Sequence, residues 1–555
     1  MSRPATIDAP ARSLWPGGLG LVLLVALTFW PVLTFDFVRW DDDNNITHNP
    51  LLTAPWSWDL VTQMFSGNQA LRFKPLHWLG NRGLHALFGF EPVAWHAFNL
   101  ALHLAATVLF YVVLRQVFGR LAPDAKKLRA DWAAFAGAGL WALHPLRAEA
   151  VAWATASTYP LTAVALLGSF ACYLQAFATR GRRWLFAAWV LAVAAYASYP
   201  VAITYGLWLM AADCWLLPGD AEKEGPWATG RSRAWGVKHA AFLAPAALAV
   251  GVTLWSRYAA PGMFTTAPTV ESVGLATRAT MALASLAWFV RHLVWPVDLT
   301  PNLPPVDFSS GTLLSVTALA GLVLLGLLII WQRRMRAPRV ALVVLGFVAL
   351  ALPCLGLTEQ PTWPVDRYGY IVHLVLIGGA AGWLMGWAGD RRGRLVAGGL
   401  LLGGLALASA FAARRQAMIW QDNTTLFTHM ERAPHFADNP RQQGHIYYLW
   451  GSAEVVAARP ARAAALFDRA QQVYLAAIRA AVGRADYAEA LSLSTHLERN
   501  FALTPVMHRE RGAWLLRLGR RPEALAELQI ARAALPEDAR TRALQAEAAR
   551  TPGQP

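Results

Sequence analysis

Residues 92–115 read PVAWHAFNLALHLAATVLFYVVLR, a mostly apolar run that ends at Arg115. A helix needs roughly 17 to 25 such residues to cross the hydrocarbon core of a bilayer. Only a helix or a closed barrel can cross there, because every backbone polar group must find its partner inside the protein. The stretch therefore predicts a transmembrane helix, and other segments of the chain repeat its pattern.

The composition agrees with a membrane location. Of the 555 residues, 56% are hydrophobic and only 15% are charged, which lies outside the usual range for soluble domains. Many of the 26 tryptophans lie near the ends of apolar runs, where the indole ring fits the headgroup region. The net charge of +15 comes from short Lys and Arg clusters between these runs. We assign it to membrane orientation and expect no nucleic-acid partner.

The same length rule predicts about eleven transmembrane helices, so the expected fold is all-α and polytopic, with the lipid bilayer as its surroundings. The first run, from about Pro16 to Phe35, has no convincing cleavage site and is interpreted as an uncleaved span. The predicted spans are centred near residues 25, 105, 138, 168, 191, 208, 248, 321, 349, 377 and 403.

The positions of the basic clusters predict the orientation, because Lys and Arg near span ends are retained in the cytoplasm. Clusters follow the second, fourth, sixth, eighth and tenth spans. The N-terminus is therefore expected in the cytoplasm and the C-terminal tail on the opposite side. The clusters begin at Arg115, Arg180, Lys223, Arg333 and Arg391.

One apolar segment, residues 276–295, does not fit this alternation. It carries Arg278, Arg291 and His292, and counting it as a span would move the later Arg clusters to the outer side. We expect it to lie along the outer face instead.

The character of the chain changes after about residue 412. Residues 1–412 are predicted to form the transmembrane domain, and residues 413–555 a soluble helical domain on the outer side. In this tail Ala, Leu and Arg recur at helical spacing, and the stretch GRRPEALAELQIARAALPED (519–538) looks like half of a tetratricopeptide repeat. We expect a small solenoid with a surface for a partner, a protein or glycan acceptor being the candidate.

This topology places the unusual polar residues in four outer loops, residues 36–92, 144–160, 257–311 and 358–367. The first opens FDFVRWDDDNNITHNP (35–50), with Asp41, Asp42 and Asp43 in a row. Adjacent carboxylates repel, which raises at least one proton affinity and favours a base or a cation site. The alternative is a solvated turn or helix cap, but acids close to lipid are usually kept for a purpose.

Candidate phosphate-binding or substrate-binding residues occur in all four loops. A basic side chain fixed in one orientation can bind a phosphate. The alternative is a purely structural role, in which the side chain forms a local ion pair or extends to the membrane interface. The candidates are Lys74 in the first loop, His144, Arg147 and Glu149 in the second, Arg291 and His292 in the third, and Arg367, Tyr368 and Tyr370 at the end of the fourth.

Metal binding is not predicted. His96, Asn99 and His103 form a stripe on the second span, but polar side chains also join membrane helices through hydrogen bonds. The three cysteines, Cys172, Cys214 and Cys354, have no metal-ligand spacing. No glycine-rich nucleotide loop stands out, so no cofactor is expected.

The ordered landmarks resemble one family. The stretches FVRWDDDNNITHNP (37–50), LHPLRAEAVAW (143–153), LVWPVDLTPNLP (293–304), VDRYGYIV (365–372) and WQDNTTLFTHM (420–430) are similar to the TMTC-type transmembrane and tetratricopeptide proteins and their bacterial relatives. These belong to the GT-C glycosyltransferases related to protein O-mannosyltransferases. The resemblance covers about residues 35–430, and its landmarks are specific only in combination.

This resemblance implies a metal-independent enzyme of the bacterial inner membrane, with its active site facing the periplasm. It would transfer a sugar from a polyprenyl-phosphate donor to a hydroxyl group of a protein, glycan or lipid, with Asp41 or Asp42 as general base. One departure from the family is that relatives carry charged residues after VAW, where this chain has Ala156, Ser157, Thr158 and Tyr159. Two other classes stay open: a non-catalytic scaffold that uses the tail, and a transporter. Against the transporter, the charges lie at the span ends and no repeated halves are visible.

Overall fold

The computed structural model of the chain describes residues 15–66, 73–121, 127–216, 233–259, 274–303, 338–357, 364–389 and 391–549. These residues form helices and turns, and none of them forms a strand. The chain divides into two compact units, Met1–Thr425 and Leu426–Pro555. The division lies beyond the boundary expected at residue 412, because α16 (Arg392–Met418) continues past it.

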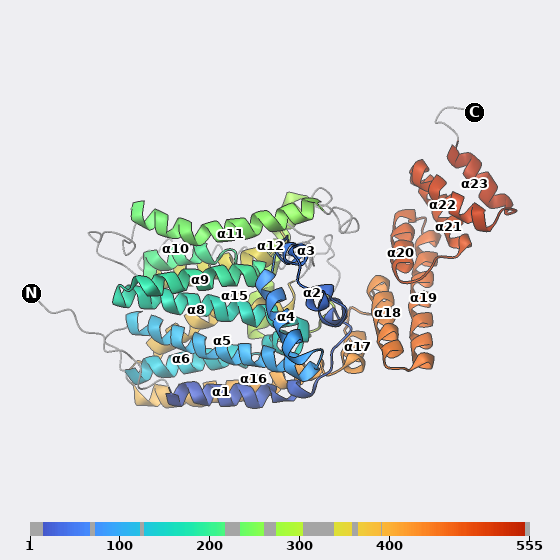
Figure 1. The fold of residues 1–555 in the computed structure, drawn as a ribbon. Helices are drawn as coiled ribbons and strands as arrows, with labels where there is room; N and C mark the ends of the chain where they lie inside the picture. Colours follow the sequence, from blue (N-terminus) through green and yellow to red (C-terminus); the bar gives the residue numbers. More distant parts are fainter. Residues whose placement is uncertain are drawn as a thin grey trace, which may run out of the picture. The chain divides into compact units, whose positions relative to one another are not determined.

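The first unit is a bundle of roughly parallel helices (Figure 1). Its long helices are apolar on most sides, as helices surrounded by protein and lipid must be. In chain order the described helices are α1 (Trp15–Phe29), α2 (Pro50–Thr53), α3 (Trp58–Ser66), α4 (Pro75–Phe88), α5 (Pro92–Leu121), α6 (Lys127–Ala142), α7 (Ala148–Ala152), α8 (Thr158–Thr179), α9 (Arg182–Ser198), α10 (Tyr205–Leu216), α11 (Arg233–Ala259), α12 (Leu275–Val294), α14 (Pro338–Ala351), α15 (Gly369–Ala388) and α16.

Six helical segments of the described residues are long and apolar enough to cross a membrane: Gly17–Thr34, Pro92–Leu121, Ala154–Thr179, Ala234–Ser256, Asp366–Ala388 and Gly393–Met418. The protein is thus a helical membrane protein. The shorter helices α6, α9 and α10 run alongside these segments in Figure 1. The expected span near residue 321 lies outside the described residues, so the count of eleven stays a prediction.

Helix α12 lies across one end of the bundle rather than along it. Near its start, Arg278 donates from Nη1 to the carbonyl oxygen of Gly356 at 3.3 Å. Near its end, His144 and His373 donate from Nε2 to the carbonyl oxygens of Leu293 and Phe289, both at 3.0 Å. Because these partners lie in loops or first turns at the same end of the bundle, α12 has the position expected for residues 276–295.

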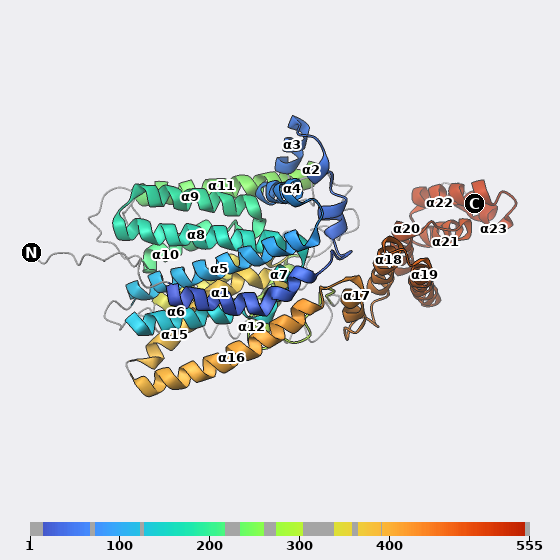
Figure 2. The same ribbon diagram turned by 60° about the horizontal axis from the view of Figure 1, so that its bottom comes forward.

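The first loop contributes α2, α3 and α4, and both views place α3 and α4 at one end of the bundle (Figures 1 and 2). Arg82 of α4 fastens this loop, donating to the carbonyl oxygens of Leu51 (2.7 Å) and Ala54 (2.6 Å). Trp78 and Trp95 pack with Ile46 and Leu51 in the core beneath it. The loop is therefore a folded platform with its own core.

The second unit is made of helical hairpins. Its elements are α18 (Pro440–Val456), α19 (Pro460–Gly483), α20 (Tyr487–Asn500), α21 (Pro505–Arg517), α22 (Arg521–Ala534) and α23 (Ala539–Ala549), and α17 (Asn423–Glu431) spans the boundary. Gly451 and Gly512 allow two of these hairpins to close tightly. A Cβ at Gly451 would lie 2.7 Å from the Phe467 ring, and one at Gly512 would lie 2.5 Å from the Leu528 side chain.

The hairpins share one register. A residue with positive φ follows a helix at Ala458, Ala485 and Gly519. Five residues later comes a buried alanine each time, Ala463, Ala490 and Ala524. The three hairpins thus share one local geometry, and the tetratricopeptide-like identity of the tail stays a prediction.

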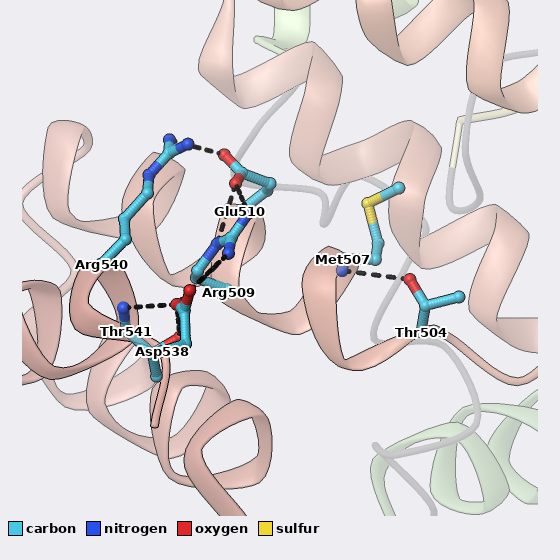
Figure 3. Close-up of polar contacts among 7 residues, drawn as sticks. All are labelled: Thr504, Met507, Arg509, Glu510, Asp538, Arg540 and Thr541. Atoms are coloured by element: carbon cyan, nitrogen blue, oxygen red, sulfur yellow. Dashed lines mark hydrogen bonds and ion pairs between the residues drawn. The ribbon is translucent and has the colours of Figure 1, made fainter. Parts of the chain in front are cut away.

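Polar contacts hold the last hairpin to α23 (Figure 3). Arg509 of α21 donates to the Asp538 carboxylate at 3.2 Å, and Asp538 also accepts from the backbone N–H of Thr541 at 2.8 Å as the cap of α23. Arg540 donates to Glu510 at 2.9 Å. These partly exposed contacts orient α23, but each adds little stability.

Candidate functional site

Residues 144–160, the second of the predicted outer loops, form the centre of the candidate site, and we call them the central segment. It consists of three short pieces, Pro145–Arg147, α7 and Ala154–Ser157, before α8 begins. His144 caps the first piece by accepting the N–H of Leu146 at its Nδ1 (3.3 Å). Every residue of the segment is buried, and the carbonyl of Trp153 at its break accepts from Asn99 Nδ2 at 2.8 Å.

Asp42 connects the first outer loop to the central segment. One carboxylate oxygen accepts from the backbone N–H of Val38 at 2.9 Å. The other accepts from the N–H (3.0 Å) and the hydroxyl (2.6 Å) of Thr155. Burial raises the pKa of Asp42 from 3.8 to about 7, although the hydrogen bonds from Thr155 and Val38 oppose that rise. Repulsion by Asp41, on which the sequence argument relied, is the smallest cause.

The three aspartates have different surroundings. Asp41 is exposed and has φ 72°, a conformation that few non-glycine residues adopt. Its carbonyl oxygen accepts from the N–H and side-chain amide of Asn45, at 2.9 and 3.1 Å. Asp43 pairs with Arg39 at 3.4 Å near the surface. Asp42 thus binds the first loop to the central segment, whereas Asp41 is exposed to solvent.

Arg367 is held by Glu149 of the central segment. Its guanidinium donates to Glu149 Oε1 at 2.6 Å, and its backbone N–H donates to Oε2 at 2.9 Å. Its Nε donates to the Tyr159 hydroxyl at 3.1 Å, and the guanidinium lies 5.0 Å from the centre of the Trp153 ring. The structure therefore pairs Arg367 with Glu149 rather than with its neighbour Asp366.

Arg147 of the central segment is fully buried. It donates to the carbonyl oxygen of Gly369 at 2.8 Å and to His373 Nδ1 at 2.9 Å. Its Nε has no hydrogen-bond partner among the described residues. Burial lowers the pKa of Arg147 to about 9, against the attraction of Tyr370 and Asp366. This guanidinium has no carboxylate bound to it directly.

Lys74 reaches the central segment through its neighbour His77. The Lys74 ammonium is buried and lies 4.1 Å from the centre of the Trp78 ring. His77 Nδ1 lies 3.2 Å from the Ser157 hydroxyl, and Asn81 donates to its Nε2 at 3.2 Å. Burial, and then the charge of Lys74, hold the pKa of His77 well below its usual value. His77 is therefore a neutral donor to Ser157.

The remaining predicted residues make other contacts. Both ring nitrogens of His144 are engaged, with Leu146 and Leu293. His292 donates to the carbonyl of Trp288 at 2.9 Å, and Arg291 is exposed on α12. Tyr370 is buried and its hydroxyl donates to His103 Nδ1 at 2.6 Å, whereas Tyr368 is half-buried next to Arg367.

The structure thus gathers Asp42, Glu149 and Arg367 on the central segment, which also carries the buried Arg147, with Lys74 nearby. Sequence reasoning missed the partners that hold them: Thr155, Ser157, Tyr159, His77 and His373. For Thr155, Ser157 and Tyr159 the only sequence signal is the hydroxyl-rich stretch ATASTY (154–159), and His77 and His373 have no such signal. Within the described ranges, no three His, Cys, Asp or Glu residues form a metal-binding group.

Comparison with known proteins finds a partial match. The chain is 34% identical over 153 residues to the human protein O-mannosyl-transferase TMTC4, which covers 26% of this chain and 20% of that protein. The mouse protein of the same name is 32% identical over 159 residues, 27% of this chain and 21% of that protein. The matched part thus spans about a fifth of the length of these relatives. No family model matches, and no solved structure matches. Over about a quarter of its length, the chain is similar to protein O-mannosyl-transferases, which supports a general glycosyltransferase-like role.

Proposed function

We propose that the protein transfers a sugar, mannose being the first candidate, from a polyprenyl-phosphate donor to an acceptor hydroxyl. The observation that supports this proposal is that Asp42 of the first loop and Arg367 of the fourth both bind the central segment. The loop that carries the aspartates and the candidate phosphate-binding arginine are thereby attached to the same segment, although they lie more than 300 residues apart in sequence. The partial similarity to protein O-mannosyl-transferases supports the same reaction class.

Asp41 is the proposed base. It is exposed and held at a strained backbone angle, which is typical of residues fixed for function, whereas the oxygens of Asp42 already accept three hydrogen bonds. The Asp41 carboxylate would take the proton of the acceptor hydroxyl as that oxygen bonds to the sugar C1. The bond from C1 to the phosphate oxygen breaks, and polyprenyl phosphate leaves with the electron pair. Such a base contributes roughly 10²- to 10⁴-fold in rate.

Arg367 and Lys74 are the proposed phosphate ligands. The leaving phosphate gains negative charge as the bond breaks, so cations fixed nearby stabilise the transition state more than the ground state. Glu149 and Tyr159 fix the orientation of Arg367 in advance. Arg147 adds a buried positive charge to the same segment, and Tyr368 lies beside Arg367. His144, Arg291, His292 and Tyr370 are further candidates. The reaction needs no cofactor beyond the lipid-linked donor.

The proposed setting is the bacterial inner membrane, with the site and the tetratricopeptide-like tail in the periplasm and a GT-C-type bundle of about eleven spans. The tail would present a protein or glycan acceptor. A scaffold without activity is the second candidate. One observation favours it, namely that Arg367 is already saturated by Glu149 and Tyr159 while residues 156–159 carry no charge.

The test uses the full chain in liposomes with radiolabelled polyprenyl-phosphate mannose and a bacterial membrane extract as acceptor. We expect Asp41→Asn to lower label transfer at least 100-fold with an unchanged melting temperature, and Asp42→Asn to lower both. Asp59→Asn is the control, because Asp59 is an exposed carboxylate on α3 that only accepts from Gln63. Full transfer by both Asp41→Asn and Asp42→Asn, or none by the wild type, would favour the scaffold.

A further inference from the structure

Asp366 is a largely buried carboxylate in the candidate site whose side chain receives no hydrogen bond from any described residue. Its exposed fraction is 7%, and its backbone carbonyl accepts the N–H of Gly369. Its carboxylate oxygens have no partner among the described residues and do not belong to the fully buried atoms, so a ligand can reach them. The neighbouring Arg367 gives both its backbone N–H and its guanidinium to Glu149 instead. Most polar groups with so little exposure are hydrogen-bonded within the protein, so the Asp366 carboxyl is free to take its donors from a ligand.

The surroundings of Asp366 are charged and aromatic. The charged groups that act on its carboxyl are Glu149, Arg367 and Arg147. Arg147 is bound to Gly369, three residues further along, and has its own unpartnered Nε. The rings of Trp153, Tyr159 and Tyr368 all lie within 6.0 Å of the Arg367 guanidinium. Carboxylate, guanidinium and aromatic faces are together the groups suited to a phosphorylated sugar.

Because no described residue donates to the Asp366 carboxyl, a ligand that brings donors forms hydrogen bonds there that the protein does not supply. A carboxyl group accepts hydrogen bonds in both its neutral and its ionised form. Sugar hydroxyl groups are such donors. In a glycosyl phosphate they lie a few bonds from the phosphate, and the backbones of Asp366 and Arg367 lie about 3.8 Å apart.

We propose that Asp366 binds hydroxyl groups of the sugar that is transferred, while Arg367 binds the adjacent phosphate. This inference rests on the proposed function and assigns the sugar-recognising side of the same site. A site built to hydrogen-bond a substrate hydroxyl discriminates strongly against ligands that lack it. Asp366 is thus a determinant of specificity for a sugar-bearing lipid over the bare lipid phosphate.

The experiment measures binding and transfer separately. Quenching of tryptophan fluorescence by polyprenyl-phosphate mannose and by bare polyprenyl phosphate gives two dissociation constants for the full chain in detergent. We expect Asp366→Asn and Asp366→Ser to weaken the mannose lipid at least tenfold and the bare phosphate less than twofold. Their melting temperatures should equal or exceed that of the wild type, because the unpartnered carboxyl is gone. Asp59→Asn should change neither constant.

Equal weakening of both lipids, no weakening of either, or a lower melting temperature in both variants would overturn the role of Asp366. A wild type that does not bind the mannose lipid more tightly than the bare phosphate would overturn it as well. If the mannose lipid binds with the expected dependence on Asp366 but no label is transferred, the binding role stands and the proposed transfer reaction fails.

Discussion

Two buried aspartates of the membrane domain, Asp213 and Asp366, have opposite surroundings. Asp213 of α10 is fully buried and accepts from Lys238 at 2.5 Å, from His239 at 2.8 Å and from Tyr173 at 2.7 Å. The Asp366 side chain is almost as buried and accepts from no described residue. The two carboxylates thus differ in their donors and not in their burial, and this difference is the reason for proposing that Asp366 binds a ligand.

The Asp213 cluster joins three helices. Tyr173 belongs to α8, Asp213 to α10, and Lys238 and His239 to α11. Ionisable groups within a membrane protein are costly and are normally paired with one another, and here the pairing is complete for the carboxylate. We interpret this cluster as a tie that fixes α11 to the bundle, whereas the proposed role of Asp366 is to accept its donors from a ligand.

The largest effect should come from breaking the Asp213 tie. Lys238→Met leaves a buried carboxylate without its cation, which costs about 3–5 kcal/mol. The double variant Asp213→Asn/Lys238→Met removes both charges and keeps an acceptor for His239 and Tyr173, so it should recover most of the loss. Thermal unfolding in detergent measures both. Arg394→Met, at an exposed arginine of α16, is the control and should change stability by less than about 0.5 kcal/mol.

A double variant as unstable as Lys238→Met would contradict this interpretation, because the uncompensated charge would then not be the cause.

The second effect concerns Glu149, whose partner Arg367 belongs to the candidate site. In Glu149→Gln an amide NH₂ faces one of the two Arg367 donors, so one charge-assisted hydrogen bond is lost at a cost of about 1.5–3 kcal/mol. Asp43→Asn breaks the more exposed Arg39 pair and should cost less than about 1 kcal/mol. Melting temperatures of the two variants test the difference. Equal losses would mean that the Glu149 pair is no stronger than a surface pair.

The general fold could be predicted from the sequence because long apolar runs have few alternatives. The run at residues 92–115 became α5, and Arg278, Arg291 and His292 predicted correctly that α12 does not fit among the spans. Length was less informative for α10, which has 12 described residues and is therefore too short by itself to count as a membrane-spanning helix. Its place depends on packing against neighbouring helices, which no local pattern encodes.

The sequence predicted which charged residues belong to the candidate site, but not which residues they bind. Arg367 and Asp366 are neighbours in sequence, yet consecutive residues on a helical turn do not face each other. Glu149, 218 residues earlier, is the partner. Thr155 is likewise 113 residues from Asp42, and a hydroxyl group has no sequence signature of such a contact. Long-range pairs of this kind depend on the tertiary fold.

The third effect is a pH dependence that separates Asp42 from a fully paired carboxylate such as Asp213. The pKa of Asp42 is raised from 3.8 to about 7, so between these values the folded state holds a proton that the unfolded state releases. This contribution is present below pH 4 and is lost as the pH rises to 7. The melting temperature of the wild type minus that of Asp42→Asn should therefore fall across this window. A constant or rising difference would contradict the buried position of Asp42.

The smallest effect isolates one hydrogen bond of Asp42. Thr155→Val removes the hydroxyl at 2.6 Å and keeps the backbone N–H at 3.0 Å, which should cost about 1 kcal/mol. Because the hydroxyl lowers the pKa of Asp42, its loss should move the midpoint of the preceding pH profile upward. Thr162→Val is the matched control, since this buried hydroxyl donates at 2.6 Å to the carbonyl of Thr158 and not to a carboxylate. It should leave the midpoint unchanged, and an equal displacement in both variants would mean that the profile does not report Asp42.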